Sequence, residues 1–424
     1  MLMKREMQQR ESGPGRREIW SRMARFAACG MVLMLGSAGA LPAPRVFLLR
    51  RRPLARLRAR LRRPPLSPAL AAFMDQLQKQ ARRALHAGPF SVMDKAYIPP
   101  SGNKHDYMSW APYFWPNPRT PNGLPYIRRD GRRNPQIRKI TDHDELHQLI
   151  PAVETLALAG FLTGRERYAA HAAHLIRVWF LDPATRMNPN LNYAQGIPGR
   201  VKGRGIGIID TAGFPHLIDA IGLLAGSPAW TQADQAGMES WFQRYLHWLR
   251  TSRNGRAEQA AKNNHGTWYD VQAADEALFT GQTGLARQIL LRARRRRIAL
   301  QIVASGREPL ETARTQSFQY SMMNLRGLCE LARLGQFAGV NLWRYRSPRG
   351  AGIVTALDYL LPYALGRKRW PYHEITRWSP RGLRPMLWAA ERHDRPRANA
   401  LRAALRQIGF STEEKIWLSL GWQN

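Results

Sequence analysis

Apolar residues recur at helical spacing along most of this chain of 424 residues, and this pattern limits the folds that it can adopt. After Asp144, for example, Leu146, Leu149, Ile150 and Val153 fall three or four positions apart, as on one face of an α-helix. Strand-like alternation is scarce. Further helical stretches lie near residues 67–86, 168–180, 214–225, 234–251, 267–280, 283–304, 315–335 and 352–365. Because short connections favour antiparallel neighbours, the pattern predicts an all-α ring of helix pairs around a central cleft.

Two stretches interrupt the helical pattern, and both are long for loops. Residues 97–136 hold many prolines, glycines, asparagines and aromatic residues, and residues 184–212 carry asparagine and glycine. Long ordered loops within a domain are often functional. We therefore expect polar loops at one rim of the cleft.

The N-terminal segment has the layout of a secretory signal. Residues 26–41 are apolar and uncharged, Arg22 and Arg25 precede them, and small residues stand near the end of the stretch. The stretch is short for a transmembrane helix, which needs about 20 apolar residues. We interpret residues 1–41 as a targeting segment, which predicts a periplasmic or secreted protein. A membrane-anchored or disordered tail is the alternative, and the start codon and the type of signal stay open.

The next residues, 42–66, are rich in proline and arginine. This composition is typical of a linker or a disordered arm. We therefore predict three parts: a targeting segment over 1–41, a basic linker over 42–66, and one helical domain over 67–424.

The chain is strongly basic, with 65 Lys and Arg against 30 Asp and Glu and a formal net charge of +35. Such a charge favours the encounter with polyanions, which include nucleic acid, anionic lipid and acidic polysaccharide. Charge alone does not choose among them. The excess of arginine over lysine can also reflect a GC-rich genome.

Cysteine and histidine spacing gives no sign of a disulfide framework or a zinc site. Cys29 lies in the predicted targeting segment and Cys329 in a predicted core helix. His143 and His147 stand four positions apart and can share one helix face, a spacing that is also common by chance. We expect neither a metal nor a cofactor.

Two polar clusters carry the side chains that are suited to chemistry. Residues 262–272 read Lys-Asn-Asn-His-Gly-Thr-Trp-Tyr-Asp-Val-Gln, and residues 314–320 read Arg-Thr-Gln-Ser-Phe-Gln-Tyr. Uronic-acid polymers can be cut by elimination, in which a base removes the proton on carbon five and the oxygen on carbon four leaves. Because that proton is very weakly acidic beside a charged carboxylate, the site must neutralise the carboxylate.

The clusters supply every group that this elimination needs. Asn264 and Arg314 can neutralise the carboxylate, since the fork of an arginine matches two oxygens. His265 can act as the base or tune Tyr320, and Tyr320 can act as base and acid, because nearby positive charge lowers the pKa of a tyrosine. In the alternative interpretation, Asn263 and Asn264 cap a helix and Tyr320 is a core aromatic residue.

The same clusters resemble the motifs of the alginate-lyase-domain family of polysaccharide lyases. The likeness covers roughly residues 90–390. The similar motifs are Asn-Asn-His-Gly-Thr-Trp-Tyr-Asp (263–270), Leu-Glu-Thr-Ala-Arg-Thr-Gln-Ser-Phe-Gln-Tyr-Ser (310–321), the substrate-loop motif Ser-Trp-Ala-Pro-Tyr-Phe-Trp-Pro (109–116), Asn-Tyr-Ala-Gln-Gly-Ile-Pro-Gly (192–199) and Arg-Gly-Ile-Gly (204–207).

The resemblance implies an incomplete α/α toroid with a deep cleft, and it implies roles by position. Asn264 matches the carboxylate-neutralising amide of the family and His265 its catalytic histidine. Arg314 matches the neutralising arginine and Tyr320 the catalytic tyrosine. We also predict contacts to the substrate from loop aromatics that suit stacking on sugar rings, or that pack the loop onto the body, and from nearby polar residues. These residues are Trp110, Tyr113, Trp115, Gln195, Arg204, Asn263 and Tyr269.

We therefore predict a polysaccharide lyase that cleaves a polyuronate, first of all alginate, by β-elimination and leaves an unsaturated uronate at the new non-reducing end. A lyase for glucuronan or another uronate polymer is the alternative among enzymes, and a non-catalytic polyanion-binding protein is the alternative outside them. The expected partner is an acidic polysaccharide, with no nucleic acid and no stable membrane insertion after removal of the signal. The uronate that is cleaved, the endo or exo mode and the oligomeric state stay open.

Overall fold

The structure is a computed structural model that describes residues 44–376, 386–387, 395–407, 416–417 and 419–421. The predicted targeting segment, residues 1–41, lies outside the described residues. Contacts between residues divide the chain at this same point, and the fold described here is that of the part that starts at Pro42.

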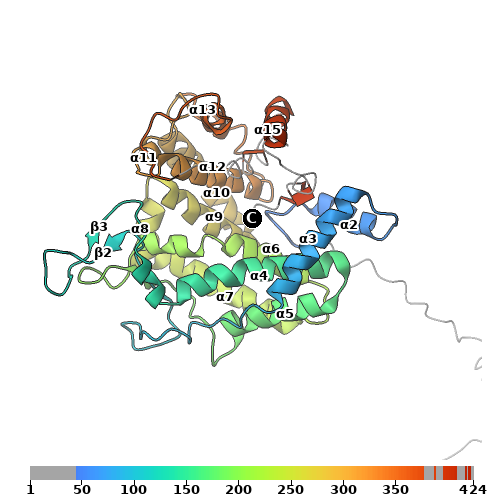
Figure 1. Ribbon diagram of the computed structural model, residues 1–424, viewed down its shortest axis with the longest axis horizontal. Coiled ribbons are helices and arrows are strands. Elements are labelled where there is room, and N and C mark those ends of the chain that lie inside the picture. The colour runs from blue at the N-terminus through green and yellow to red at the C-terminus, as the bar shows by residue number, and fades with distance from the viewer. Residues whose placement is uncertain (1–43, 377–385, 388–394, 408–415, 418, 422–424) are drawn as a thin grey trace, which may run out of the picture. The chain divides into compact units, whose positions relative to one another are not determined.

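α-Helices form most of this part (Figure 1). In chain order they are α2 (Arg51–Leu61), α3 (Pro68–Ala84), α4 (Asp142–Thr163), α5 (Glu166–Ile176), α6 (Phe214–Leu224), α7 (Gln232–Thr251), α8 (Arg253–Ala260), α9 (Asn264–Phe279), α10 (Thr283–Ala293), α11 (Pro309–Thr312), α12 (Ser317–Leu334), α13 (Ile353–Ala364) and α15 (Arg395–Gln407). The tighter turns η1 (Pro135–Lys139) and η3 (Gly205–Thr211) are 3-10 helices, whereas η2 (Arg177–Leu181) and η4 (Arg294–Ala299) are π-helices.

Four helices pack side by side in the order α4, α6, α9, α12, and other helices pack against them. α5 packs on α4, α7 and α10 pack on α9, and α13 packs on α12. This arrangement of inner and outer helices confirms the predicted helix pairs (Figure 1). α4 and the joined segment of η3 and α6 are apolar over a length that could cross a membrane, but most of each is packed inside the body.

Helix α9 lies at the centre of this packing. Every residue from Gly266 to Phe279 is buried, and within the helix only His265 remains partly accessible. A helix that is covered on all sides needs no apolar stripe, which explains why its sequence mixes polar and apolar residues.

Local sequence signals set where several helices begin and end. Thr231 and Asp234 form a capping box at the start of α7, in which each side chain accepts a hydrogen bond from the backbone of the other. Such a cap stabilises a helix by about 1 kcal/mol. α4 ends at Gly164, whose left-handed conformation (φ +69°) suits glycine.

Two small pairs of strands hold the long loops in place. β1 (Met108–Trp110) pairs in parallel with β4 (Tyr193–Gly196), which joins the loop before α4 to the loop before α6. β2 (Phe114–Trp115) pairs antiparallel with β3 (Ile127–Arg128), so that Phe114 lies opposite Arg128. The predicted loops are therefore fixed to each other as well as to the helices.

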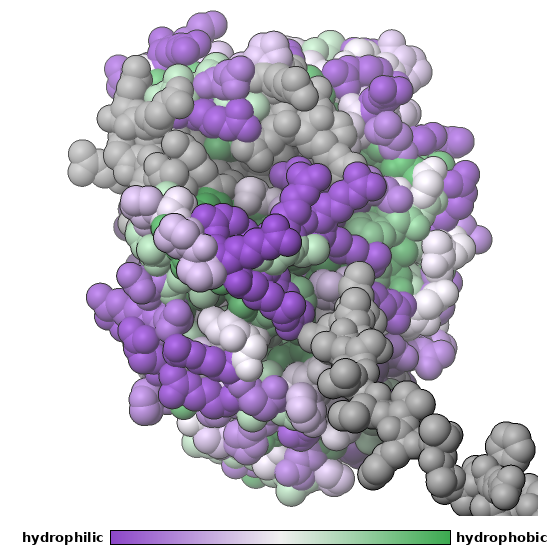
Figure 2. All heavy atoms as spheres, turned by 90° about the vertical axis from the view of Figure 1, so that its right-hand side faces the viewer, coloured by the Kyte–Doolittle hydropathy of each residue, from purple (hydrophilic) through white to green (hydrophobic). Residues whose placement is uncertain are grey.

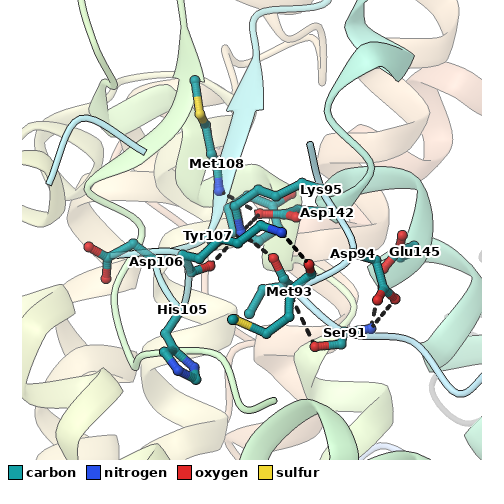
Figure 3. A network of polar contacts seen from close by, with 12 residues as sticks. Ser91, Met93, Asp94, Lys95, His105, Asp106, Tyr107, Met108, Asp142 and Glu145 are labelled. Carbon is teal, nitrogen blue, oxygen red and sulfur yellow. Dashed lines mark hydrogen bonds and ion pairs between the residues drawn. The ribbon is translucent and has the colours of Figure 1, made fainter. Parts of the chain in front are cut away.

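A buried ion pair anchors the first long loop to the start of α4 (Figure 3). Lys95 Nζ lies 3.0 Å from Asp142 Oδ2, and both side chains are fully buried. Lys95 also donates to the carbonyl oxygen of Lys104, and the Met108 N–H donates to Asp142 Oδ2 at 2.8 Å. Burial raises the pKa of Asp142 to about 7, although Lys95 opposes this shift. The pair fixes strand β1 beside the first turn of α4.

The described part of residues 42–66 corrects the prediction of a linker. Phe47 and Leu49 are buried, and their N–H groups donate to the Asp219 carboxylate on α6. Leu54 of α2 is also fully buried. The average composition concealed these apolar residues because residues 46–49 are a short apolar run between arginines. Figure 2 shows the face of the molecule that carries α2 and α3, where hydrophilic side chains predominate.

Candidate active site

A cavity with a volume of 580 Å³ lies where the N-termini of α9 and α12 meet the two long loops. All four residues that were predicted to be catalytic line it: Asn264, His265, Arg314 and Tyr320. Four of the seven predicted substrate contacts, Tyr113, Gln195, Arg204 and Asn263, line it as well. The other lining residues are Pro112, Phe114, Arg128, Arg133, His143, His147, Ile206, Ile209, Asp210, Ala212 and Met323.

The ring of His265 is oriented by a carboxylate from α8. Its Nδ1 lies 2.7 Å from Oε1 of Glu258, whose side chain is 2% exposed. Because a carboxylate accepts the hydrogen bond, Nδ1 carries the hydrogen and Nε2 is the nitrogen that can accept a proton. Arg297 supports this arrangement from η4, since it binds Asp270 of α9 and the carbonyl oxygens of Gln259 and Ala261.

Asn264 is held by a second buried carboxylate. Its N–H and its Nδ2 donate to the two oxygens of Glu311 at 2.6 and 2.7 Å. One Nδ2 hydrogen is left for a ligand. Burial raises the pKa of Glu311, although the bonds from Asn264 lower it. The capping alternative is wrong for these side chains, because Asn263 stands at the cap position of α9 without a side-chain cap and Asn264 binds Glu311.

Arg314 already uses its fork within the protein. Nε and Nη2 donate to the two oxygens of Asp130 at 3.0 and 2.8 Å, so Nη1 is the nitrogen that is left for a ligand. Burial lowers the pKa of Arg314, but Asp130 and Tyr320 outweigh it and the net shift is upward. Burial acts to raise the pKa of Asp130, and hydrogen bonds from Arg314 and Arg128 bring it well below its usual range.

The loop that carries Asp130 depends on a glycine. Gly131 has a left-handed backbone (φ +72°), and a Cβ there would lie 2.5 Å from Oγ1 of Thr315. The carbonyl oxygen of Gly131 also accepts a hydrogen bond from Gln316 Nε2 at 2.8 Å. Only glycine adopts this left-handed backbone without strain and leaves the space that Thr315 occupies.

Tyr320 lies between Arg314 and Tyr113. The guanidinium carbon of Arg314 is 4.0 Å from the centre of the Tyr320 ring, which is a cation–π contact. The hydroxyl oxygens of Tyr320 and Tyr113 are 2.6 Å apart. Burial and Tyr113 raise the pKa of Tyr320, and Arg314 lowers it by less. The sequence interpretation expected a lowered pKa, which is wrong here because burial outweighs the nearby positive charge.

Gln195 and Arg204 form one wall of the cavity together with Asp210. Gln195 is the one non-glycine residue with a positive φ (+48°) in the described part of the chain. Its Nε2 donates to Asp210 at 2.8 Å and its Oε1 accepts from Arg204 at 3.0 Å. The amide of Gln195 is thus used within the protein, whereas Arg204 packs over the Phe114 ring and lines the cavity.

Three predicted substrate contacts lie elsewhere. Tyr269 is 1% exposed and donates to the carbonyl oxygen of Leu249, so this prediction is wrong and the residue belongs to the core. Trp115 donates to the carbonyl oxygen of Arg132 and packs the loop. Trp110 lines a separate hollow beside residues 196–202 and not the main cavity. Aromatic residues that are adjacent in a loop point to different sides, which the sequence does not reveal.

The partner carboxylates were not found from the sequence. Glu258 stands near His265 in the chain, and the scarcity of acids in so basic a sequence is a signal that could have found it. Glu311 lies 47 residues from Asn264, which is too far for a local pattern. Asp130 lies 184 residues from Arg314, so no local pattern joins them. Within the described residues no group of three His, Cys, Asp or Glu is arranged to bind a metal. That the protein needs no metal or cofactor stays a prediction.

Comparison with known proteins assigns the family. The family model described as alginate lyase matches residues 91–370. The chain belongs to the alginate lyase family. The crystal structure of an alginate lyase from Bacteroides ovatus is 37% identical, with a TM-score of 0.84 over 90% of this chain and 100% of that chain. No curated protein sequence matches.

A more distant relative shares the fold. Alginate lyase A1-III from Sphingomonas species A1 is 16% identical, with a TM-score of 0.54 over 88% of this chain and 95% of that chain. A variant of that enzyme complexed with a tetrasaccharide also has a TM-score of 0.54 at 16% identity, over 88% of this chain and 94% of that chain. The lyase described here therefore has the α/α toroid that was predicted. It is a polysaccharide lyase, and the alternative of a non-catalytic polyanion-binding protein is set aside.

Proposed function

We propose that this lyase cleaves alginate by β-elimination and leaves an unsaturated uronate at the new non-reducing end. The observation that supports the proposal is the meeting of Asn264, His265, Arg314 and Tyr320 around one cavity. A lyase for glucuronan or another uronate polymer remains the alternative, because each of these polymers presents the same carboxylate beside carbon five.

The amide of Asn264 and the guanidinium of Arg314 bind the uronate carboxylate. Asn264 offers its second Nδ2 hydrogen and Arg314 offers Nη1, since their other donors are bound to Glu311 and Asp130. Fixed donors of this kind stabilise the charge that develops when the proton on carbon five leaves, and they need no reorganisation during the reaction. The two carboxylates hold the donors in place before the substrate arrives.

His265 removes the proton and Tyr320 supplies one. Nε2 of His265 takes the proton from carbon five, the electron pair forms the double bond between carbons four and five, and the bond from carbon four to the glycosidic oxygen breaks. That oxygen takes the hydroxyl proton of Tyr320. The raised pKa of Tyr320 keeps it protonated at rest, which suits an acid better than a base. Proton exchange with water then restores both side chains.

The test is the ultraviolet absorbance of the unsaturated product, measured separately with polymannuronate, polyguluronate and glucuronan. We expect the wild-type enzyme to release unsaturated product from at least one of the two alginate polymers. The rate of release should fall by at least about a hundredfold in His265→Asn and in Tyr320→Phe. Tyr363→Phe, on α13 and outside the cavity, is the matched control for loss of a hydroxyl. Circular dichroism checks that each variant folds. Unsaturated product from glucuronan alone would make glucuronan the proposed substrate instead of alginate. Full turnover in Tyr320→Phe would refute the assigned roles.

We also propose that the protein is periplasmic or secreted. The apolar stretch at 26–41 behind Arg22 and Arg25 supports export, and a polymeric substrate of this kind is met outside the cytoplasm. Cell fractionation, with mass spectrometry of the mature N-terminus, tests this proposal. Recovery of the uncleaved chain in the cytoplasm would contradict it.

A further inference from the structure

Two histidines line the cavity that the proposed elimination does not use. His143 and His147 lie on the first two turns of α4, in the same cavity as His265 and Tyr320. Their rings stack, with centroids 4.1 Å apart and planes at 21°. The spacing of four residues places both rings on one face of the helix, which is the face that meets the cavity.

Each ring has one nitrogen engaged and one available. Nδ1 of His147 lies 2.8 Å from the carbonyl oxygen of His143, and Nδ1 of His143 lies 3.2 Å from Oδ1 of Asp144. Both partners only accept hydrogen bonds, so each Nδ1 carries the hydrogen. Nε2 of each ring is then an acceptor, and it becomes a donor when the ring takes a proton.

The charges around the pair favour an anion. Arg133 lines the cavity beside the pair, and its charge acts on His147. The nearby acids are engaged: Asp144 faces Arg138 of η1 at 3.6 Å, and Asp210 of η3 accepts hydrogen bonds from Tyr107, Ser109 and Gln195. Desolvation and the charge of His143 lower the pKa of His147, and Arg133 acts in the same direction, whereas the hydrogen bond to the His143 backbone and the charge of Asp210 raise it by less. An anion in the cavity would reverse that balance.

We propose that His143, His147 and Arg133 form a second carboxylate subsite, which binds the uronate next to the one that is cleaved and takes up one proton as it does so. This inference rests on the proposed function, because every sugar of a polyuronate carries a carboxylate. Two positive charges at the separation of the stacked rings repel each other strongly in a partly buried site. That repulsion limits the stacked pair to one proton, and a carboxylate at a similar distance favours that proton by a similar amount.

A metal ion is the other common ligand of two histidines on one helix face. The described residues place no third His, Cys, Asp or Glu to complete such a site. The cation of Arg133 beside the pair also favours an anion over a metal. The geometry therefore supports the carboxylate.

The test measures binding and proton uptake without turnover. In the Tyr320→Phe background, calorimetry with an alginate tetrasaccharide in two buffers of different ionisation enthalpy gives the protons that are taken up. We expect a fraction of a proton, up to about one, and an affinity that weakens roughly tenfold between pH 6 and pH 8. Adding His143→Asn and His147→Asn should abolish both effects. His171→Asn with His174→Asn, the neighbouring pair on α5 outside the cavity, is the matched control.

Kinetics of the active enzyme give a second, independent readout. The double variant His143→Asn/His147→Asn should raise KM roughly tenfold and leave kcat within about twofold, because the subsite binds a sugar that does not react. Equal proton uptake and equal pH dependence with and without the pair would overturn the inference. Loss of binding on addition of a chelator would overturn it in favour of a metal. A wild-type enzyme that releases no unsaturated product from any polyuronate would instead refute the proposed function, which separates the two failures.

Discussion

Replacement of Glu258 by glutamine tests how the protein prepares its base. The carboxylate accepts a hydrogen bond from Nδ1 of His265 at 2.7 Å and is 2% exposed, and it does not line the cavity. A glutamine keeps the shape but loses the charge, and its NH2 group can donate to Nδ1. The imidazole would then carry its hydrogen on Nε2, where it cannot accept a proton from the substrate.

The structure sets the size of the expected effect. The carboxylate also stabilises the imidazolium that forms when His265 takes the proton. With the two charges about 4 Å apart and an effective dielectric constant near 20, this stabilisation is about 4 kcal/mol, or roughly a thousandfold in rate. Because the glutamine retains a hydrogen bond, we expect kcat to fall by about 100- to 1,000-fold.

The assay is the initial rate of ultraviolet absorbance over a range of polyuronate concentrations. KM should stay within about twofold, since Glu258 does not touch the substrate. Glu239→Gln, on the exposed side of α7, removes a carboxylate from the surface and should have no effect. A kcat of Glu258→Gln within threefold of wild type, in a protein with an unchanged melting temperature, would refute the reasoning.

Three further changes probe the supports of the site and of the fold. Asp130→Asn loosens the fork of Arg314 and removes the negative charge that Arg314 binds, so kcat should fall about tenfold or more while KM also falls, measured by the same assay. Lys95→Met leaves the Asp142 carboxylate buried without its partner and should lower the free energy of unfolding by about 3–5 kcal/mol in urea denaturation. Burial raises the pKa of Asp219 to about 6, so the protonated carboxyl favours the folded state. This contribution to stability is complete below the pKa that Asp219 has in the unfolded chain, and it is lost as the pH rises through about 6. Asp219→Asn should flatten the fall in unfolding free energy between pH 4 and pH 6.

For each of these three predictions, one result would contradict the reasoning. A rise in KM for Asp130→Asn would mean that the freed Arg314 is misplaced, and Asp358→Asn at the surface pair with Arg397 is its control. Unchanged urea stability of Lys95→Met would contradict the anchoring role of the ion pair. An unaltered slope with pH in Asp219→Asn would assign the pH dependence to another group.

Much of the fold was predictable because helical periodicity is local. The inner and outer helices largely coincide with the predicted stretches, but α2, α8, α11 and α15 were not predicted. α8 and α11 are short, and α8 has few apolar residues, so no stripe marks it. α2 and α15 are rich in arginine. The start of α9 at Asn264 was placed three residues late, because a helix that is buried on every side lacks the amphipathic pattern that marks its limits.

The sequence by itself determined the helix pairs, the motif residues Asn264, His265, Arg314 and Tyr320, and the class of reaction that such groups support. Helical periodicity and sequence motifs are both patterns among residues that are close together in the chain. Only the tertiary structure decided that Asp130 occupies the fork of Arg314, that Tyr320 is held protonated, and that Tyr269 belongs to the core. Burial and charge partners depend on segments that meet across the ring, and no local pattern in the chain encodes those distances.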